Sequence, residues 1–292
     1  MSKIGWIGIG VMGRSMCGHL LSAGHEVKVY TRTKASAESI IAAGAQWCDT
    51  PGEVARDSEF VFTIVGFPAD VRSVYLDEGG LVDSAAPGTV LVDMTTSEPA
   101  LAVEIHRAAT ARGLAALDAP VSGGDLGAKN AALAIMVGGE QEPFDRAVPL
   151  FEKMGKNIRL MGGPGAGQHT KMSNQILIAG TMVGVVESLL YAVKSGLDVD
   201  AVIDVIGSGA AGSWSINNLG RKIAKDDYDP GFFIKHFVKD MGIALAEARK
   251  MGIALPGLAL VEQLYVAAMA QGLENMGTQG LFVAMKHING MK

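Results

Sequence analysis

The first half of the chain alternates between short apolar runs and longer segments in which apolar residues recur at helical spacing. Segments 14–23 and 34–43 have this helical character, and they end at Gly24 and Gly44, as a later helix does at Gly113. Such alternation predicts βαβ units, and right-handed crossovers then favour a doubly wound parallel sheet with helices on both faces. The predicted strands are residues 4–7, 27–30, 60–65, 90–93, 114–117 and 133–137.

The pattern changes near residue 160, where the segment from Met161 to Gly167 is the densest run of glycine and proline in the protein. This composition predicts a loop. Helical periodicity dominates after it, so we expect an α/β domain over residues 1–163 and an all-α domain over residues 164–292. The expected helices are residues 168–195, 199–207, 235–251, 257–271 and 277–288, and the first should be buried on several sides because small and apolar residues surround it.

Composition excludes several classes of protein. Hydrophobic residues make up 49% of the 292 residues and charged residues 19%, which suits buried cores and argues against disorder. The net charge is −5 and no dense Lys/Arg run occurs, so we expect no nucleic-acid partner. We find no targeting segment and no apolar stretch of about 18 residues, so we expect a cytoplasmic protein without a membrane span. Cys17 and Cys48 should be reduced, packed thiols.

The motif Gly8-Ile9-Gly10-Val11-Met12-Gly13 has G-x-G-x-x-G spacing. A predicted strand precedes it, a helix follows and a second strand comes next, which is the context of a Rossmann-type dinucleotide-binding loop. Gly8 should make the tight turn, Gly10 should let the backbone approach a pyrophosphate, and Gly13 should allow close helix–strand packing. We therefore assign all of these residues to cofactor binding at a helix N-terminus.

The residues after the second predicted strand indicate which nucleotide is bound. Enzymes that use NAD usually place an acidic residue there to accept a hydrogen bond from the ribose 2′-hydroxyl. This chain instead has Thr31-Arg32-Thr33-Lys34, which offers cations and hydroxyl donors to a 2′-phosphate. The sequence therefore predicts that NADP(H) is preferred, with NAD(H) as the second choice.

Two further strand ends carry residues suited to the cofactor, because ligands of doubly wound sheets bind beyond the carboxyl ends of the strands. Phe67 and Pro68 follow the strand that ends near residue 65 and should lie against the cofactor ribose. Thr96 follows the strand 90–93, in a hydroxyl-rich turn with Thr95 and Ser97. The same turn is also suited to capping the helix that starts at Pro99.

Four segments in order along the chain resemble the β-hydroxyacid dehydrogenase family, which includes 3-hydroxyisobutyrate dehydrogenases, tartronate semialdehyde reductases and glyoxylate/succinic semialdehyde reductases. They cover most of the chain. The segments are the glycine motif from residue 7, Asp118-Ala119-Pro120-Val121-Ser122-Gly123-Gly124, Gly165-Ala166-Gly167 followed by Lys171 and Asn174, and Lys235-His236-Phe237-Val238-Lys239-Asp240.

The resemblance implies roles for individual residues. Lys171 would be the catalytic lysine, and Ser122, Gly123 and Gly124 would bind the substrate carboxylate. Several relatives carry Asn four residues after the lysine, where this chain has Gln175, while Asn174 lies three residues after it; both spacings put an amide on the lysine's face of the helix, so either amide is a candidate for substrate contact. The resemblance also assigns Thr96 and Lys239 to the cofactor, and Phe232 and Asp240 to the border of the active site.

The chemistry of these residues agrees with the resemblance. Oxidation of an alcohol needs a base for the hydroxyl proton, and a lysine serves when burial or nearby cations lower its pKa toward neutrality. Lys171 follows a glycine-rich loop and begins a largely apolar helix, so burial is expected. The segment Val121–Ser122 with its two glycines suits either an anion-binding nest or an ordinary strand-to-helix turn. The six histidines show no metal-ligand spacing, so no metal is predicted.

Other functions remain open at this point. An imine reductase or a 6-phosphogluconate-type dehydrogenase would share the architecture, but Lys171 argues against the first, and only Arg221-Lys222 offers a basic pair for a sugar phosphate. A non-catalytic NADP(H)-binding sensor would have no use for Lys171. The small residues and Trp214 of segment 209–218 suggest either the wall of a pocket for a compact carboxylate substrate of few carbons or a helix–helix turn packed by the tryptophan. The small-residue-rich helices at the C-terminal end suggest a homodimer or homotetramer.

Overall fold

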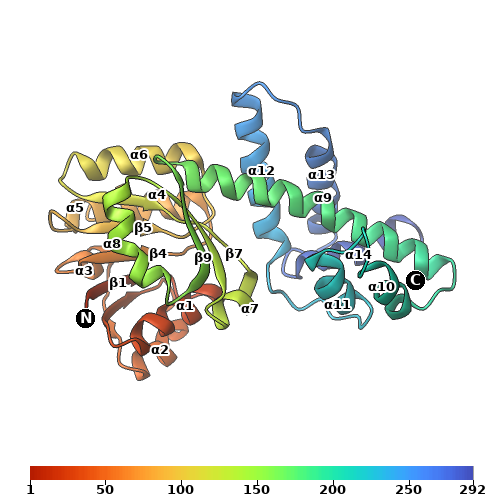
Figure 1. The fold of residues 1–292 in the computed structure, drawn as a ribbon, viewed down its shortest axis with the longest axis horizontal. Helices are drawn as coiled ribbons and strands as arrows, with labels where there is room; N and C mark the ends of the chain where they lie inside the picture. The colour runs from red at the N-terminus through yellow and green to blue at the C-terminus, as the bar shows by residue number, and fades with distance from the viewer. Residues whose placement is uncertain (292) are drawn as a thin grey trace. The chain divides into compact units, whose positions relative to one another are not determined.

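The computed structural model describes residues 1–291. The chain folds into two compact units, Met1–Lys171 and a second unit that begins at Met172. The predicted boundary between residues 163 and 164 falls in the loop before helix α9 (Ala166–Lys194), and this helix carries the chain from the first unit into the second. The α/β unit precedes the helical unit, as the hydrophobic pattern predicts (Figure 1).

The first unit contains one sheet with the strand order β3-β2-β1-β4-β5-β6-β8-β7, and β9 pairs with β8. Neighbouring strands from β3 to β6 run parallel, which confirms the doubly wound parallel sheet. The sheet is not parallel throughout, because β8 runs antiparallel to both β6 and β7. The strands are β1 (Lys3–Ile7), β2 (Glu26–Tyr30), β3 (Gln46–Trp47), β4 (Phe60–Thr63), β5 (Val90–Asp93), β6 (Ala115–Asp118), β7 (Val121–Ser122), β8 (Leu133–Gly138) and β9 (Gly155–Gly162).

Three of these strands were not predicted, and each lacks the apolar run by which a buried strand is found. Strands β3 and β7 have two residues each, and β9 is an eight-residue strand whose residues are mostly exposed or half-buried. A strand that is covered on few sides has no need of a continuous hydrophobic sequence. Tertiary pairing with β2 and β8 therefore decides their conformation.

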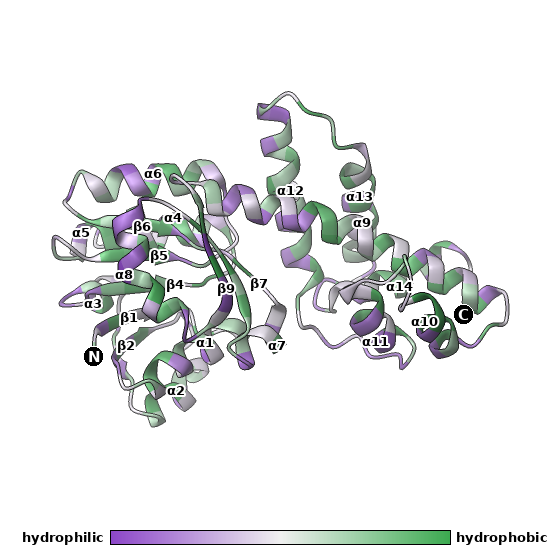
Figure 2. Cartoon of the chain, viewed as in Figure 1, coloured by the Kyte–Doolittle hydropathy of each residue, from purple (hydrophilic) through white to green (hydrophobic). Residues whose placement is uncertain are grey.

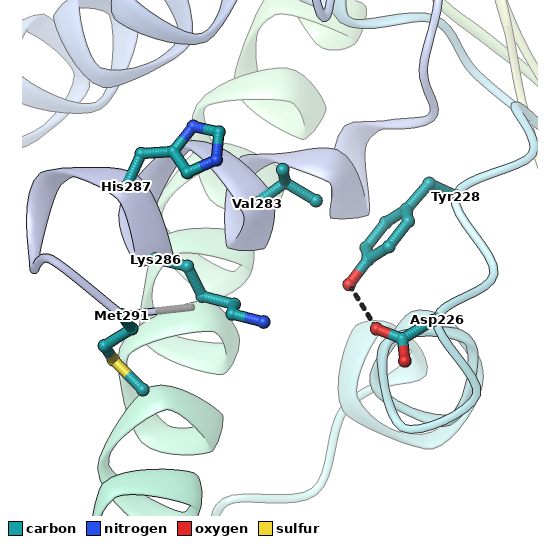
Figure 3. A pocket seen from close by; sticks show the side chains of 6 residues that line it. All are labelled: Asp226, Tyr228, Val283, Lys286, His287 and Met291. Carbon is teal, nitrogen blue, oxygen red and sulfur yellow. Dashed lines mark hydrogen bonds between the residues drawn. The ribbon is translucent and has the colours of Figure 1, made fainter.

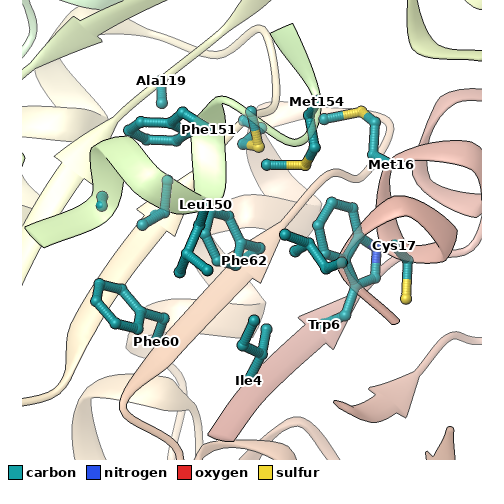
Figure 4. Close-up of a cluster of buried hydrophobic side chains, with 14 of the residues drawn as sticks. Ile4, Trp6, Met16, Cys17, Phe60, Phe62, Ala119, Leu150, Phe151 and Met154 are labelled. Carbon is teal, nitrogen blue, oxygen red and sulfur yellow. The ribbon is translucent and has the colours of Figure 1, made fainter. Parts of the chain in front are cut away.

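The sheet buries two layers of apolar side chains, one on each face. On one face Trp6 of β1 stacks on Phe62 of β4 with ring centroids 5.6 Å apart, and Phe151 meets Phe62 edge-on at 6.1 Å (Figure 4). Strands β4 and β5 are buried along their whole length, and the contact of Phe62 with Phe151 joins this face of the sheet to helix α8 (Gln141–Phe151). The central strands thereby become a rigid base for the loops at their carboxyl ends.

Helices cover both faces of the sheet. Helix α8 is coloured both purple and green in Figure 2, as expected for a helix with one face buried and one face in water. The predicted glycine stops are confirmed, since Gly24, Gly44 and Gly113 have φ of 87°, 113° and 72°. The other helical segments of this unit are α1 (Val11–Ser22), η1 (Lys34–Ala37), α2 (Glu38–Ala42), α3 (Pro51–Ala55), α4 (Pro68–Leu76), α5 (Leu81–Ser84), α6 (Pro99–Thr110) and α7 (Gly124–Lys129).

The described part of the second unit is helical, as predicted. In its core Phe237 meets Tyr265 edge-on at 5.1 Å, and the Tyr265 hydroxyl donates a hydrogen bond to the Thr278 carbonyl at 2.9 Å. A π-helical segment, η2 (Ser215–Gly220), overlaps the C-terminal end of segment 209–218, which the sequence suggested as a pocket wall. The remaining elements are α10 (Val199–Ile206), α11 (Arg221–Ile223), α12 (Ile234–Lys250), α13 (Pro256–Ala270), η3 (Thr278–Gly280) and α14 (Leu281–Ile288).

Helix α9 differs from its prediction in one respect. By length and composition it could cross a membrane, yet Met182, Val186 and Leu189 are fully buried in the core of the second unit. One face of the helix is nevertheless open, because Leu177 and Tyr191 are 72% and 74% exposed. Small and apolar residues occur around most of the helix circumference, so the sequence does not indicate which face packs within the chain and which face is exposed.

Candidate active site

The glycine motif forms the turn between β1 and α1, and each glycine meets a different constraint. Gly8 has φ of 97°, and a Cβ there would lie 2.1 Å from the Ile64 carbonyl oxygen. A Cβ on Gly13 would lie 2.0 Å from the Gly8 oxygen, so helix and strand could not pack as closely. A Cβ on Gly10 would meet nothing within 4 Å, and Gly10 caps α1 without a side-chain hydrogen bond. Open space before an uncapped helix N-terminus fits a pyrophosphate.

The basic turn after β2 lies at the same edge of the sheet. The Arg32 side chain is 80% exposed, and its Nη1 donates to Asp70 Oδ1 at 3.0 Å. Lys34 Nζ lies 5.0 Å from the centroid of the Trp47 ring. The turn therefore carries two cations: the exposed guanidinium of Arg32, which lies beside the Asp70 carboxylate, and the ammonium of Lys34, which lies over the Trp47 ring. This arrangement fits an anionic group at the end of β2 and adds Asp70, which the sequence did not indicate.

The loops after β4 and β5 are hydrogen-bonded to each other. Thr95 Oγ1 accepts from the Val65 backbone N–H at 3.0 Å, and the Phe67 N–H donates to Asp70 Oδ2 at 3.2 Å as α4 begins at Pro68. Thr95 is therefore a structural link, which leaves Thr96 as the residue predicted to contact the cofactor. Ser97 does not cap α6, because Glu98 occupies the N-cap position.

Ser122 lies in β7, and the glycines after it make a sharp turn into α7. Gly123 and Gly124 have φ of 132° and 63°, which only glycine adopts readily. The segment is thus a strand-to-helix turn with two consecutive left-handed residues, and such turns expose successive backbone N–H groups. The sequence suggested either an anion-binding nest or an ordinary strand-to-helix turn. The two are compatible, because the backbone N–H groups of this turn would be the donors of the nest.

Lys171 lies in the second turn of α9 with only 7% of its surface exposed. Its Nζ donates a hydrogen bond to the Val121 carbonyl oxygen at 2.8 Å. The amine is therefore at the strand that carries Ser122, inside the first unit. The expectation that this lysine is buried is confirmed, and it is not an extended surface side chain.

Two buried polar residues near Lys171 were not among the predicted site residues. Asp118, at the end of β6, accepts from the Gly165 and Gln168 backbone N–H groups, both at 2.8 Å. Burial raises the pKa of Asp118 to about 6, although these N–H donors act to lower it. Gln168 is completely buried, and it bonds the turn after β5 through the Ser97 N–H and the Thr95 oxygen. The signal for Asp118 was present in the sequence, since an aspartate at the end of a buried strand is almost never buried without polar partners.

Within the second unit, another polar group joins residues from the fourth motif. Gln175 Nε2 donates to Asp240 Oδ2 at 2.6 Å, and Lys239 Nζ lies 2.9 Å from Asp240 Oδ1. Asn174 Nδ2 donates to Gln175 Oε1 at 2.8 Å. Phe232 is half-buried and packs against Phe237. The structure thus links Asn174, Gln175, Lys239 and Asp240 by direct contacts.

A hollow of about 370 Å³ in the second unit is lined by other residues (Figure 3). Tyr228 donates to Asp226 Oδ1 at 3.2 Å there, and burial raises the pKa of Tyr228 to about 12. None of the predicted site residues lines it. Among residues 1–291, no three His, Cys, Asp or Glu side chains gather closely enough to hold a metal ion. The hollow is lined by Asp226, Tyr228, Val283, Lys286, His287 and Met291.

A glycine-loop nucleotide domain with a buried lysine beside a Ser-Gly-Gly turn defines a class, the NAD(P)-dependent oxidoreductases. Comparisons with known proteins agree with this assignment. Residues 3–163 match the NAD binding domain of 6-phosphogluconate dehydrogenase, and residues 165–283 match the NAD-binding domain of NADP-dependent 3-hydroxyisobutyrate dehydrogenase.

Individual relatives match over nearly the whole chain. The probable 3-hydroxyisobutyrate dehydrogenase-like 1, mitochondrial, of Arabidopsis thaliana is 54% identical, covering 99% of this chain and 87% of the relative. The 2-hydroxy-3-oxopropionate reductase of Escherichia coli is 36% identical over 97% of both chains. The structure of Mycobacterium tuberculosis 3-hydroxyisobutyrate dehydrogenase with L-serine has a TM-score of 0.88 and 29% identity, covering 98% of this chain and 99% of that one.

The chain belongs to the 3-hydroxyisobutyrate dehydrogenase family of β-hydroxyacid dehydrogenases. It is an NAD(P)-dependent oxidoreductase of the type that acts on CH–OH groups. The resemblance of the four motifs is thereby confirmed, and a non-catalytic nucleotide sensor no longer describes the protein.

Proposed function

We propose that this enzyme transfers a hydride between NADP(H) and a small β-hydroxy acid or its semialdehyde, with Lys171 as the general acid and base. The observation that carries the proposal is the buried Lys171 amine bonded to the Val121 carbonyl at 2.8 Å, next to Ser122. A buried amine at hydrogen-bonding distance from the turn that would bind a carboxylate meets the geometric requirement for proton transfer.

The residues divide the chemistry between them. The nicotinamide, when bound, accepts or supplies the hydride. Lys171 takes the hydroxyl proton during oxidation and returns it to the carbonyl oxygen during reduction. Ser122 donates its hydroxyl hydrogen to the substrate carboxylate, and the N–H groups of Gly123 and Gly124 donate alongside it. The Val121 carbonyl fixes the direction of the amine, since it accepts one of the lysine hydrogens.

The preference for NADP(H) rests on the turn after β2. Arg32 and Lys34 supply positive charge, and Thr31 and Thr33 supply hydroxyl donors, where an enzyme for NAD would place an acid. Asp70 keeps the exposed Arg32 guanidinium close to the end of β2. Gly8 to Gly13 bind the pyrophosphate, while Phe67, Pro68, Thr96 and Lys239 contact the rest of the nucleotide in this proposal.

The amide that contacts substrate is Asn174 in our proposal. Gln175 is 2% exposed, its nitrogen donates to Asp240 and its oxygen accepts from Asn174. Both ends of the Gln175 amide are therefore occupied by protein, and its role is to orient Asn174. Asp240 and Phe232 support this group in the second unit.

A substrate and nucleotide panel tests the proposed function. NADPH oxidation or NADP⁺ reduction is followed at 340 nm with 3-hydroxyisobutyrate, 3-hydroxypropionate, L-serine, glyoxylate and succinic semialdehyde, and each is repeated with NAD(H). We expect turnover of at least one β-hydroxy acid or semialdehyde, faster with NADP(H). A cyclic imine and 6-phosphogluconate serve as comparison substrates, and turnover confined to either of these would contradict the proposal.

We also propose that the enzyme is a homodimer or homotetramer whose subunits meet on α9. The exposed Leu177 and Tyr191 lie on one side of this helix, and open space surrounds Gly180 and Gly184 between them. A strip with two large apolar ends and two glycines lets another helix approach closely. A second copy of the chain suits it, because Glu187 is the only charged residue between Leu177 and Tyr191 and the strip is otherwise apolar or small.

A cytoplasmic location is the last part of the proposal. Cys17 and Cys48 are both free and buried, which suits a reducing compartment. The relative in Arabidopsis thaliana is named as mitochondrial, so the location needs its own test. Cell fractionation with an antibody against the protein provides it, and recovery in a membrane or organelle fraction would contradict the proposal.

A further inference from the structure

The first turn of α9 is attached to two strand ends by side chains to which no function has been assigned. Asp118, from the end of β6, accepts one backbone N–H on each carboxylate oxygen, from Gly165 and from Gln168. It is 5% exposed, and at pH 7 and above it is mainly a carboxylate because its pKa is about 6. A buried carboxylate that accepts N–H groups at a helix N-terminus holds the beginning of that helix firmly.

Gln168 attaches the same turn to the loop after β5. Its Oε1 accepts from the Ser97 N–H at 3.0 Å, and its Nε2 donates to the Thr95 oxygen at 2.7 Å. Thr95 in turn accepts from Val65 at the end of β4. The completely buried amide of Gln168 therefore connects α9 to the loop after β5, and Thr95 connects that loop to the loop after β4.

The packing around these bonds leaves little room for another arrangement. A Cβ on Gly138 would lie 2.5 Å from Asp118 Oδ1, and a Cβ on Gly167 would lie 2.5 Å from the Asp118 backbone oxygen. Helix α9 thus begins in direct backbone contact with β6 and β8. Lys171 follows Gln168 within one turn, so the position of this turn sets the position of the lysine amine.

We propose that Asp118 and Gln168 are positioning residues that act as a clamp on the first turn of α9, and so hold Lys171 and the Thr96 loop in the geometry needed for hydride and proton transfer. The clamp consists of their side-chain bonds to Gly165, Gln168, Ser97 and Thr95. This inference rests on the proposed role of Lys171. A displacement of the lysine by about 1 Å is enough to lower the rate roughly 10²-fold.

The test compares Gln168→Leu and Asp118→Asn with Thr89→Val. Thr89 is a matched control, because its buried Oγ1 donates to the Ser58 backbone oxygen at 2.9 Å before β5 begins, at the other end of the strands. We expect the two clamp variants to lose roughly 10²-fold in kcat, with a smaller rise in the KM for NADPH because the Thr96 loop is also released. Thr89→Val should keep its kcat even though its melting temperature falls. If Gln168→Leu folds poorly, Gln168→Met, which keeps the length of the side chain but makes neither hydrogen bond, should show the same loss of kcat.

A second measurement does not depend on turnover. Acetylation of Lys171 by acetic anhydride, followed by mass spectrometry, reports how well the amine is held. The clamp variants should be labelled about tenfold faster at Lys171 than Thr89→Val. Each variant is labelled at the same interval below its own melting temperature, so that differences in global stability do not affect the comparison. Labelling and kcat equal to those of Thr89→Val would overturn the clamp. If the wild-type enzyme turns over no panel substrate while the labelling rates still differ, the proposed function fails and the clamp stands.

Discussion

Lys171 and Lys194 belong to the same helix but lie in different surroundings. Lys194 is exposed near the C-terminal end of α9, whereas Lys171 is buried and bonded to a backbone carbonyl. Most helical lysines resemble Lys194, with a flexible stem and a hydrated ammonium group. The local environment, rather than the residue type, is what makes Lys171 a candidate acid and base.

Replacement of this lysine should therefore be specific in its effect. We expect Lys171→Ala to lower kcat by roughly 10²–10⁴-fold, because the general acid and base is lost. The affinity for NADPH, measured by fluorescence titration, should stay near the wild-type value. Lys194→Ala is the control and should behave as wild type. An unchanged kcat in Lys171→Ala would remove the residue from the mechanism.

Arg32 carries the prediction of nucleotide choice at the residue scale. Arg32→Ala removes hydrogen bonds to a doubly charged 2′-phosphate, so NADP(H) affinity should fall by roughly 1.5–3 kcal/mol. NAD(H) lacks this phosphate, and its affinity should not change. Asp70→Asn is the companion variant, since it weakens the hold on the guanidinium and should lower NADP(H) affinity by less than Arg32→Ala does. Equal losses for both nucleotides in Arg32→Ala would place the 2′-phosphate elsewhere.

At the scale of elements, two junctions build the site: the turn from β1 into α1, and the tertiary contact between the end of β6 and the start of α9. The turn from β1 to α1 brings a helix N-terminus to the cofactor, and the junction of β6 with α9 brings Lys171 to Val121. Both junctions rely on glycine, because backbone atoms approach each other more closely than a Cβ allows. The functional groups are carried by loops, while the buried central strands supply the rigidity.

The first junction allows binding and folding to be separated by two alanine substitutions. Gly10→Ala adds a methyl group in open space, so the melting temperature should be kept while both nucleotides bind more weakly. Gly13→Ala places Cβ 2.0 Å from the Gly8 oxygen, and such overpacking should cost at least about 1–3 kcal/mol of unfolding free energy. Calorimetry and nucleotide titration measure the two effects. Full nucleotide affinity in Gly10→Ala would show that the phosphates bind elsewhere.

The second junction should make stability depend on pH. Burial raises the pKa of Asp118 from 3.8 to about 6, so between these values the folded state binds the proton more tightly than the unfolded state. Unfolding free energy should therefore fall as pH rises from 4 to 6, by about 3 kcal/mol for this group, and stay constant above. Asp93 pairs with Asp118 in the register of the neighbouring strand β5, and the other contributions to the Asp118 pKa come from backbone N–H groups.

Urea denaturation of wild type and Asp118→Asn across this pH range measures the effect. The difference between the two unfolding free energies should change by about 3 kcal/mol. Other groups titrate equally in both proteins and cancel in the difference. A constant difference from pH 4 to 6 would mean that Asp118 has an ordinary pKa in the folded protein.

At the scale of the whole molecule, the exposed strip on α9 predicts assembly. Tyr191→Glu should shift the mass measured by light scattering toward the monomer, because a charge in an apolar interface must be desolvated. Tyr191→Phe keeps the apolar surface and should assemble as wild type. A monomeric wild-type protein at micromolar concentration would contradict the proposed oligomer.

The hydrophobic pattern alone determined most of the architecture. Buried strands such as β1 and β5 require continuous apolar runs, and amphipathic helices such as α8 require helical spacing, so both are readable from local sequence. The glycine motif was readable for the same reason, since each glycine answers a backbone constraint within its own turn. The burial of Lys171 could also be expected from its apolar helix.

Only the tertiary structure decided the features that join distant segments. The exposed strand β9 has no apolar run, and its pairing with β8 depends on contacts and not on composition. Gln168 is an ordinary polar residue in a helical sequence until folding places Ser97, 71 residues earlier, within 3.0 Å of its amide. Hydrogen bonds across such separations leave no periodic trace along the chain, because the partners are specified by the fold and not by their neighbours in sequence.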